Sequence, residues 1–463
     1  MKLLLWSDRC RPSLPFHQLL GLHIMLSKNN DTKIHALVTE KPTLLAASIC
    51  ILASLFYLYE FILQVSPAVM THELIRDFGL NAVSLGTMAA FYYYAYTPMQ
   101  LPAGFLFDRF GPRRLTTAAI LTCAMGALIF GISSNVAMAS AGRFMMGMGS
   151  AFSFIGTLLL ISRWFPARYF AMLTGLVQFM SCVGAIVGET PLRIAVGHWG
   201  WRPTILALSM LGMILGLLTW LAVRDSPEVV LQGNKFQATS EKTVVQSVKQ
   251  VCYNSQTWFL ALYSFMVWAP IAAFAALWGV PFLVAAYGIS TEAAATACTM
   301  IWLAIGIGCP LFGWWSDKVN LRGLPIKFAA SLGVIGLISV IYIPHLPLFF
   351  LYLCLFLFGL AASGQSIAFG VVKDINRPSV AGTAIGVNNM ATVAGGALFQ
   401  PVIGLFLQLY WNGATHQGVP FYRVTDYQKA LVLLPLCYIL AFLIGHFLIK
   451  ETHCRALYHN AKE

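Results

Sequence analysis

The sequence predicts an all-α membrane protein with twelve transmembrane helices in two six-helix halves related by pseudo-symmetry. The first supporting observation is the composition: of 463 residues, 58% are apolar and 10% are charged, and the mean hydropathy is +0.74. A soluble protein carries about a quarter of its residues as charges. The second is a set of twelve apolar stretches, each near the roughly 20 residues that cross a bilayer. The third is that short patterns recur at equivalent places in the two halves.

The first 42 residues are expected to form a cytoplasmic leader, because they contain no apolar stretch long enough to span a bilayer. The run from Leu3 to Trp6 is too short for the core of a secretion signal. The sequence leaves both Met1 and Met25 open as the start of translation.

Residues 43–223 are expected to form the first six-helix half. Its spans are apolar stretches separated by short connectors, predicted at 43–67, 82–107, 115–135, 136–162, 169–196 and 201–223. The chain is then polar over residues 224–257, where Lys235, Lys242 and Lys249 occur. We interpret this segment as a cytoplasmic linker between the halves.

Residues 258–450 are expected to form the second half. By the same criterion its six spans are predicted at 258–284, 292–316, 325–345, 347–372, 380–409 and 428–450. The last residues, 451–463, are interpreted as a cytoplasmic tail.

The distribution of lysine and arginine predicts the orientation. With both termini inside, the predicted cytoplasmic segments contain 23 basic residues and the outer loops contain four, which are Arg76, Arg202, Arg423 and Lys429. Basic residues collect on the cytoplasmic side of membrane proteins. The sequence therefore predicts a multi-pass protein of the inner (plasma) membrane with both termini in the cytoplasm.

One pattern of the form G-x-x-x-D-[RK] closes the second span of each half. It is made by Gly104, Asp108 and Arg109, with Gly111 and Arg113 following, and again by Gly313, Asp317 and Lys318. A second pattern joins spans five and eleven, where Gly175 precedes Gln178 and Gly386 precedes Asn389 by three positions. Repeated halves of this kind are typical of transporters that bind substrate at the interface between the repeats.

The chain resembles the major facilitator superfamily of secondary transporters. The signature of that family, G-x-x-x-D-[RK]-x-G-[RK]-[RK], matches residues 104–114 with one extra Pro112, and the resemblance covers about residues 43–450. It implies that Asp108 and Arg109 help to hold the cytoplasmic ends of the halves together when the outer side is open. Glu189 stands where drug exporters of the family carry a proline, and the chain also resembles the branch of the lysosomal dipeptide carrier.

Four ionisable residues are predicted within the spans of the first half, and their charges sum to zero: Glu60, Arg143, Glu189 and Arg193. A charged side chain inside a membrane costs at least about 2.5 kcal/mol, which makes each a candidate for function. Glu60, Arg143 and Glu189 are seven or eight residues from the outer ends of their spans. At about 1.5 Å per residue, the three lie about 10–12 Å deep.

Two interpretations of these charges remain open. In the structural one, Glu189 pairs with Arg193 four residues later on one helix, and Arg143 pairs with Glu60. In the functional one, Arg143 or Arg193 binds a substrate carboxylate, because a guanidinium donates two parallel hydrogen bonds. Glu60 or Glu189 then receives an amine or a proton.

The coupled proton is predicted on Glu60. Arg193 on the same helix would keep Glu189 charged, whereas Glu60 has no base on its own helix. Gln178 and Asn389 complete the predicted substrate and proton site as uncharged groups.

The function predicted from these features is secondary transport of a small polar or zwitterionic solute, such as an amino acid, a dipeptide or an organic anion, by alternating access with proton coupling. The alternatives are a uniporter, an exporter of a metabolite, and a membrane sensor that no longer transports. The sequence shows no catalytic set and no metal-ligand spacing, so an enzyme, a cofactor and a metal are not expected. The expected partners are the solute, protons and the lipid bilayer, without nucleic acid, and the chain is expected to be a monomer.

Overall fold

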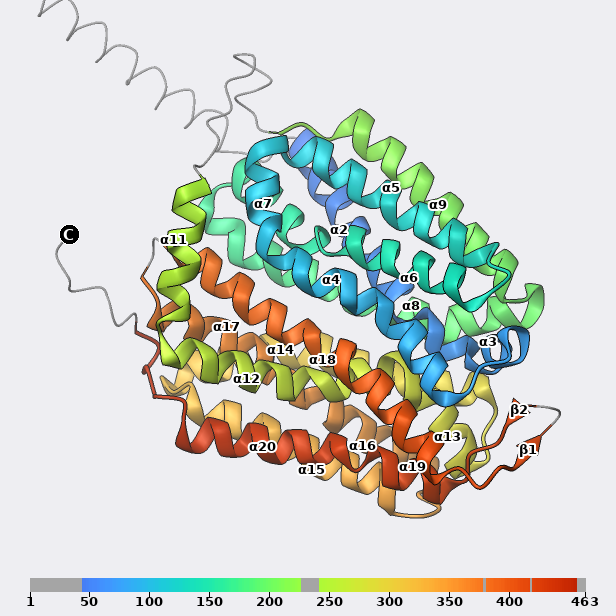
Figure 1. Ribbon diagram of the computed structural model, residues 1–463. Coiled ribbons are helices and arrows are strands. Elements are labelled where there is room, and N and C mark those ends of the chain that lie inside the picture. The colour runs from blue at the N-terminus through green and yellow to red at the C-terminus, as the bar shows by residue number, and fades with distance from the viewer. Residues whose placement is uncertain (1–43, 226–240, 378–379, 417–418, 456–463) are drawn as a thin grey trace, which may run out of the picture.

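The computed structural model of the chain describes residues 44–225, 241–377, 380–416 and 419–455 (Figure 1). Within these ranges, only the backbone is described for residues 108, 167, 168, 171, 241–245 and 247. The predicted leader, residues 1–42, lies outside the described residues, as do residues 226–240 of the predicted linker and the end of the tail after Arg455.

The first half of the chain forms a bundle of long helices. They are α2 (Leu44–Val65), the 3-10 helix η1 (Ser66–Met70), α3 (Thr71–Phe78), α4 (Ala82–Phe110), α5 (Pro112–Gly131), α6 (Val136–Ser150), α7 (Ser153–Trp164), α8 (Ala167–Trp199) and α9 (Trp201–Ala222).

The second half repeats this organisation after α11 (Glu241–Cys252). Its helices are α12 (Ser255–Pro270), the π-helix η2 (Ile271–Trp278), α13 (Gly279–Tyr287), α14 (Thr291–Val319), α15 (Gly323–Tyr342), α16 (Leu348–Ala361), α17 (Gly364–Ile375), α18 (Ala381–Tyr410), α19 (Val424–Leu431) and α20 (Leu433–Phe447). A small antiparallel hairpin of β1 (Thr415–His416) and β2 (Val419–Pro420) lies between α18 and α19.

Every predicted span coincides with a helix or a run of helices. In the described part of the chain, eleven helical runs are long and apolar enough to cross a bilayer. The remaining predicted span is α4, which is 29 residues long. The predicted all-α membrane fold is confirmed.

Both halves break their fourth span at an equivalent place. The break lies between Ser150 of α6 and Ser153 of α7, and between Ala361 of α16 and Gly364 of α17. The first span of each half also departs from α-helix near a proline, with Pro67 in η1 and Pro270 just before η2. Proline lacks an N–H and so leaves a carbonyl one turn earlier without its helical donor.

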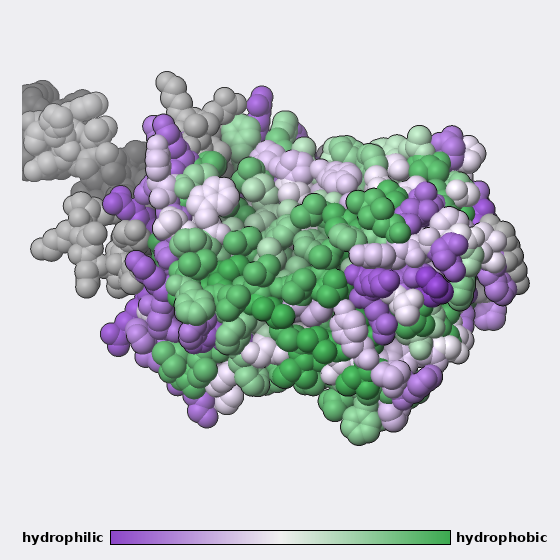
Figure 2. All heavy atoms as spheres, turned by 60° about the horizontal axis from the view of Figure 1, so that its bottom comes forward, coloured by the Kyte–Doolittle hydropathy of each residue, from purple (hydrophilic) through white to green (hydrophobic). Residues whose placement is uncertain are grey.

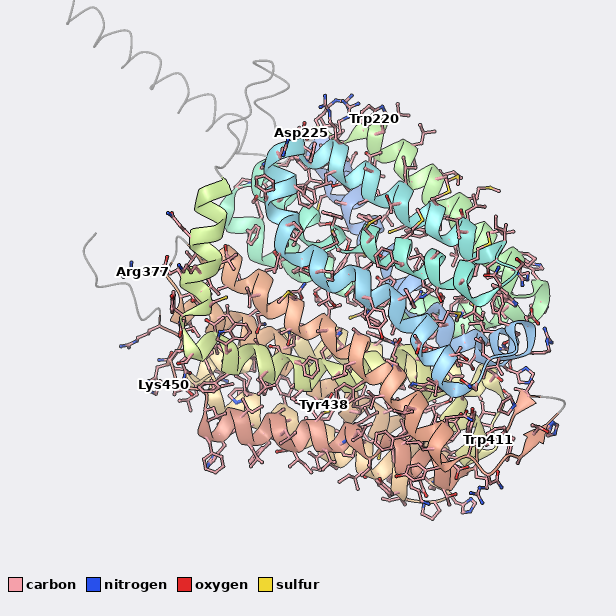
Figure 3. All side chains as sticks on the ribbon, in the orientation of Figure 1. Trp220, Asp225, Arg377, Trp411, Tyr438 and Lys450 are labelled. Carbon is pink, nitrogen blue, oxygen red and sulfur yellow. The ribbon has the colours of Figure 1, made fainter. Side chains whose placement is uncertain are left out.

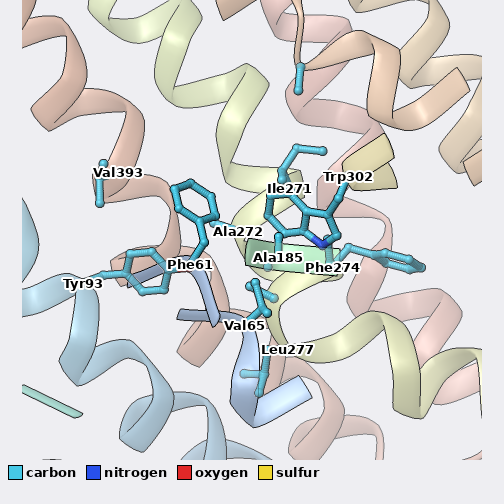
Figure 4. Packing of buried hydrophobic residues seen from close by; sticks show 14 of the residues in the cluster. Phe61, Val65, Tyr93, Ala185, Ile271, Ala272, Phe274, Leu277, Trp302 and Val393 are labelled. Carbon is cyan, nitrogen blue, oxygen red and sulfur yellow. The ribbon is translucent and has the colours of Figure 1, made fainter. Parts of the chain in front are cut away.

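The two halves meet through α4 against α18 and α8 against α14. Glycines make this contact close: a Cβ on Gly86 would lie 2.5 Å from the Gln400 carbonyl oxygen, and one on Gly404 would lie 2.3 Å from that of Ala82. Small residues allow helix backbones to approach in this way. Deeper in the interface, the rings of Phe61 and Trp302 meet edge to face with centroids 6.0 Å apart (Figure 4).

The bundle has two distinct ends. We call the end that carries α11, Asp225, Arg377 and Lys450 the linker end, and the opposite end, with β1, β2 and Trp411, the hairpin end (Figures 1 and 3). Figure 2 shows hydrophobic side chains across the middle of one face and hydrophilic ones gathered towards both ends. A protein that crosses a bilayer requires such a distribution.

Two carboxylates cap equivalent helices at the linker end. The N–H of Arg113, at the start of α5, donates to Asp225 Oδ1 at 2.8 Å. At the start of α15, the N–H groups of Arg322 and Gly323 donate to Glu451 at 2.8 and 2.7 Å. Burial alone would raise the pKa of the Glu451 carboxyl, but the N–H groups stabilise its ionised form and hold the pKa below its usual range. In each half, a carboxylate just after the last span thus bonds to the start of the third span, which is α5 in the first half and α15 in the second.

Candidate functional site

A buried carboxyl lies in the first half where α2 meets α4. Glu60 is 1% exposed, and its Oε1 accepts a hydrogen bond of 2.7 Å from the Tyr92 hydroxyl. Its Oε2 has no hydrogen-bond partner among the described residues. Burying a charged carboxylate with an unpaired oxygen costs free energy, and a proton on the group removes most of that cost. A role for Glu60 in proton exchange stays a prediction.

Arg143 on α6 is held by the end of α2. It is 0% exposed, and its guanidinium donates to the carbonyl oxygens of Leu63 at 2.6 Å and Gln64 at 3.3 Å. The Leu63 carbonyl is available because its helical donor four residues later would be Pro67, which has no N–H. The position of Pro67 in η1 therefore leaves the Leu63 carbonyl oxygen free to accept a hydrogen bond from Arg143.

The same guanidinium lies over the ring of Tyr92, with 4.8 Å between Cζ and the ring centroid. Its Nε has no partner among the described residues, and within them it has no carboxylate at ion-pair distance. The direct ion pair with Glu60 of the structural interpretation is therefore absent in this state. Glu60 and Arg143 both contact Tyr92 instead.

The tyrosines of α4 divide by helix face. Tyr92, Tyr93 and Tyr96 are buried, while Tyr94 is 39% exposed. Tyr93 accepts a hydrogen bond of 3.1 Å from Gln64, and Tyr96 stacks on Tyr92 with centroids 5.8 Å apart. Periodicity shows that the four cannot share one face, but it does not identify Tyr92 as the residue between Glu60 and Arg143.

Gly147 on α6 sets the position of Tyr92. A Cβ at this position would lie 1.8 Å from the Tyr92 carbonyl oxygen. We expect Gly147→Ala to push α4 away from α6 and to destabilise the fold by about 1–3 kcal/mol, the usual cost of overpacking. The thermal unfolding temperature of the purified protein measures this. Gly197→Ala is the matched control, because a Cβ there meets nothing within 4 Å; equal unfolding temperatures for both variants would contradict the account.

The predicted pair of Glu189 and Arg193 is wrong for this state. Arg193 forms ion pairs with Glu73 on α3 at 2.7 Å and with Glu292 on α14 at 3.0 Å. Glu189 is 0% exposed, and neither of its oxygens has a hydrogen-bond partner among the described residues. The physical reason is that Glu73 and Glu292 reach Arg193 from two other helices. Arg193 therefore does not keep Glu189 charged in this state. The coupled proton on Glu60 stays a prediction, which rests on the surroundings of Glu60 itself.

The two uncharged site candidates have different surroundings. Asn389 on α18 donates to Gln100 Oε1 on α4 at 3.0 Å, and so links the two halves. Gln178 donates to the Ser181 hydroxyl at 3.1 Å on its own helix. Among the described contacts, neither side chain touches Glu60 or Arg143. Gln100 was not predicted from the sequence, yet it is the residue of the first half that accepts this hydrogen bond from Asn389.

The predicted gating residues lie at the linker end. The Asp108 side chain is outside the described part of the structure, and a Cβ on Gly104 would meet nothing within 4 Å. Gly111 adopts φ +78° beside the Asp225 carboxylate. The described ring and ion-pair contacts of the other members stay within their own halves: Arg109 over Phe110, Arg113 over Trp220, Asp317 with Arg322 at 2.9 Å, and Lys318 over Trp314. A gating role for these residues stays a prediction.

Metal binding has no candidate in the described residues. No three His, Cys, Asp or Glu side chains of this part of the chain lie close enough together to hold a metal ion. The chemistry open to the site is therefore that of a guanidinium, a carboxyl, phenols and amides.

Comparison with known proteins identifies the family. Residues 45–400 match the family profile described as the Major Facilitator Superfamily. The chain belongs to the Major Facilitator Superfamily. It is a multi-pass membrane protein with the fold of that transporter superfamily, and it is not an enzyme.

Among its relatives is the probable galactarate/D-glucarate transporter GudP of Pseudomonas putida, which is 25% identical over 364 residues, 68% of this chain and 75% of the relative. The D-galactonate transporter of Escherichia coli O6:H1 (strain CFT073) is 23% identical over 369 residues, 74% and 85% of the two chains. The membrane sensor protein UhpC of Escherichia coli (strain K12) is 22% identical over 377 residues, 76% and 80% of the two chains.

A solved structure shows the same fold. The bacterial homologue of the human lysosomal transporter Spinster, in an inward-facing and unoccupied conformation, superposes with a TM-score of 0.69 at 15% identity. The match covers 88% of this chain and 98% of that one. At this identity the likeness concerns the fold alone.

Proposed function

We propose that the chain is a symporter that moves a small carboxylated anion together with a proton by alternating access. The observation that supports this most strongly is Arg143: a fully buried guanidinium held by two carbonyls and a ring, without a carboxylate at ion-pair distance among the described residues. A buried charge without a counter-ion is unfavourable. An anion that reaches Arg143 would supply the counter-ion and accept a fork of parallel hydrogen bonds.

A sugar acid is the substrate class that we favour. The relatives named as galactarate/D-glucarate and D-galactonate transporters support it. Buried amides with an atom that lacks a hydrogen-bond partner among the described residues also support it. They are Gln64 Oε1, Gln365 Oε1, Asn388 Nδ2 and Gln400 Oε1. Buried amide atoms of this kind can bond to the hydroxyl groups of a polyhydroxylated acid.

Glu60 is the proposed proton carrier, and Tyr92 links it to the anion site. The Tyr92 hydroxyl donates to Glu60, and its ring lies under Arg143. An anion bound to Arg143 would therefore affect the protonation of Glu60 through a single intervening side chain, Tyr92. A proton on Glu60 offsets part of the charge of the anion, so that the loaded site holds less net charge inside the membrane while it changes sides.

The state described here is closed at the hairpin end. Arg193 of α8 pairs with Glu292 of α14, and Thr190 lies 3.2 Å from the hydroxyls of Thr296 and Thr299. We propose that the linker end, with its basic residues, faces the cytoplasm of a cell whose plasma membrane holds the protein. The hairpin end then opens outward to admit the solute.

Uptake into liposomes that contain the purified protein tests this function. We expect labelled D-glucarate or galactarate to accumulate when the outside is acidic, and an excess of unlabelled D-galactonate to compete. Neutral sugars, amino acids and dipeptides serve as the comparison panel. Preferential uptake of amino acids or dipeptides would contradict the proposed substrate class, and uptake indifferent to the pH gradient would indicate a uniporter.

The likeness to UhpC supports one alternative of another class, a sensor that binds the anion without moving it. Binding of D-glucarate to the purified protein together with no uptake or exchange in liposomes would favour the sensor. Outward movement only, from liposomes loaded with the anion, would favour an exporter.

A further inference from the structure

Glu189 is a buried acid that the proposed transport site does not use. It lies on α8, it is 0% exposed, and both of its carboxyl oxygens lack a hydrogen-bond partner among the described residues. The group that faces it is the indole of Trp302 on α14, whose Nε1 also lacks a partner at hydrogen-bond geometry. Figure 4 shows Trp302 at the meeting of the halves, with Ala185, one turn before Glu189, in the same view. Glu189 therefore lies where the halves close on each other.

One turn further along α8, Arg193 joins three helices. It bonds to Glu73 on α3, to the Val69 carbonyl oxygen at 3.1 Å, and to Glu292 on α14. Glu73 belongs to the first half and Glu292 to the second, so the group spans the interface. We call Arg193, Glu73 and Glu292 the hairpin-end gate.

Among the described residues, no helix that packs on α8 forms an ion pair with Glu189. On α14, the Cys298 thiol lies close enough to interact electrostatically with Glu189, and it is not a cation. On α2, Glu60 and Tyr59 bond elsewhere, to Tyr92 and to the Leu208 carbonyl. η1 contains no titratable residue. The arginine of α9, Arg202, donates to the carbonyls of Gly131 and Ser133, and that of α7, Arg163, stands at the linker end near Asp225.

We propose that Glu189 and the hairpin-end gate form a proton-linked switch in which Arg193 exchanges Glu292 for Glu189 when the hairpin end opens. In the closed state Glu189 holds a proton, because a buried carboxylate without a cation and without a formed hydrogen bond is strongly unfavourable. On opening, α14 carries Glu292 and Trp302 away, and water reaches Glu189.

The exchange follows from spacing on α8. Residues four apart on a helix lie on one face, so Arg193 can pair with Glu189 once Glu292 has left. The O–H bond of Glu189 then breaks, the proton passes to water on the hairpin side, and the carboxylate pairs with the guanidinium. Closing reverses both steps. The proposal rests on the alternating access of the proposed function, and it adds a second proton site, apart from Glu60, that governs the gate.

The consequence is that acid on the hairpin side favours the closed state. One linked proton changes the ratio of closed to open protein by at most about tenfold per pH unit. Distance measurements between two spin labels detect this ratio without substrate. Ser134 in the first half and Asn412 in the second are exposed at the hairpin end. A ketone-bearing amino acid at each accepts a label and leaves the native cysteines untouched.

We expect the short-distance population to grow several-fold between pH 8 and pH 5 in the full-length protein in liposomes. Glu189→Gln should keep the short distance at every pH, and Glu189→Asp should restore the dependence. A wild-type distribution that is the same at both pH values would overturn the proposal, and so would an unchanged pH response in Glu189→Gln.

A Glu60→Gln protein should retain the pH response, because its proton site is separate. Loss of the response in Glu60→Gln alone would assign the switch to Glu60 and overturn the proposal for Glu189. The distance experiment contains no substrate, so a negative result there would not contradict the proposed uptake of acid anions. A negative uptake result would likewise not contradict the proposed switch. The two proposals therefore fail separately.

Discussion

Replacing Arg143 with lysine is expected to raise the KM for a carboxylated substrate about tenfold to a hundredfold, because a hydrogen bond to a charged group contributes about 1.5–3 kcal/mol. The ammonium of lysine is a point charge, and it cannot reproduce the planar fork that a carboxylate accepts. In the wild type two different nitrogens bond to the carbonyls of Leu63 and Gln64, whereas in the variant both carbonyls would depend on one ammonium. Initial rates of labelled D-glucarate uptake over a range of concentrations measure the change.

Arg202→Lys is the matched control for this prediction. Arg202 also donates to backbone carbonyls and lies over the ring of Trp201, but it does so near the hairpin end, away from Glu60. Its KM should stay close to that of wild type, because among the described contacts Arg202 does not touch Glu60, Tyr92 or Arg143. A substrate whose carboxylates are all esterified should bind wild type no better than it binds Arg143→Lys. If both single neutral variants, Glu60→Gln and Arg143→Gln, misfold and the double variant recovers, the binding role of Arg143 is wrong.

The Glu60→Gln protein is expected to exchange labelled for unlabelled anion and to fail to accumulate it against a gradient. A glutamine keeps the shape of the protonated acid and still accepts the Tyr92 hydrogen bond, but it cannot release a proton. Accumulation driven by an inward pH gradient should fall to the level of simple equilibration, while exchange persists. Both are measured in the same liposomes, with and without unlabelled anion inside.

Glu60→Asp serves as the control, because it retains a titratable carboxyl one methylene shorter. It is expected to retain some accumulation, at a lower rate. A Glu60→Gln protein that still concentrates the anion would show that proton coupling does not pass through this residue. Loss of exchange as well would indicate that Glu60 contacts the solute directly.

The helices were predictable because length and apolarity suffice to recognise a membrane span. Even the long α8 and α18 begin and end within a few residues of the predicted limits. One further repeat between the halves is also encoded in the sequence. Gly79 and Gly288 end α3 and α13 in the left-handed region, at φ +62° and +63°, and each is followed two residues later by the Asn or Ser that caps the next helix.

The partners of the charged residues were not predictable in the same way. Spacing along one helix favours Glu189 for Arg193, but Glu292 is 99 residues away in sequence and belongs to the other half. Only the packing of α8 on α14 brings the two together. By contrast, the anchor of Arg143 had a local signal, since Pro67 frees the carbonyl of Leu63. The free carbonyl of Leu63 is thus readable from the sequence, whereas the arginine that bonds to it, 80 residues away, requires the fold.

The measurement that tests the central claim most directly is the luminal pH of liposomes that contain the protein and a pH-sensitive dye. The two sides start at equal pH without a membrane potential, and D-glucarate is then added outside. The account predicts that the lumen of wild-type liposomes acidifies as the anion enters, and that liposomes with Arg143→Gln show no change. Entry of the labelled anion into wild-type liposomes at constant luminal pH would contradict proton-coupled transport.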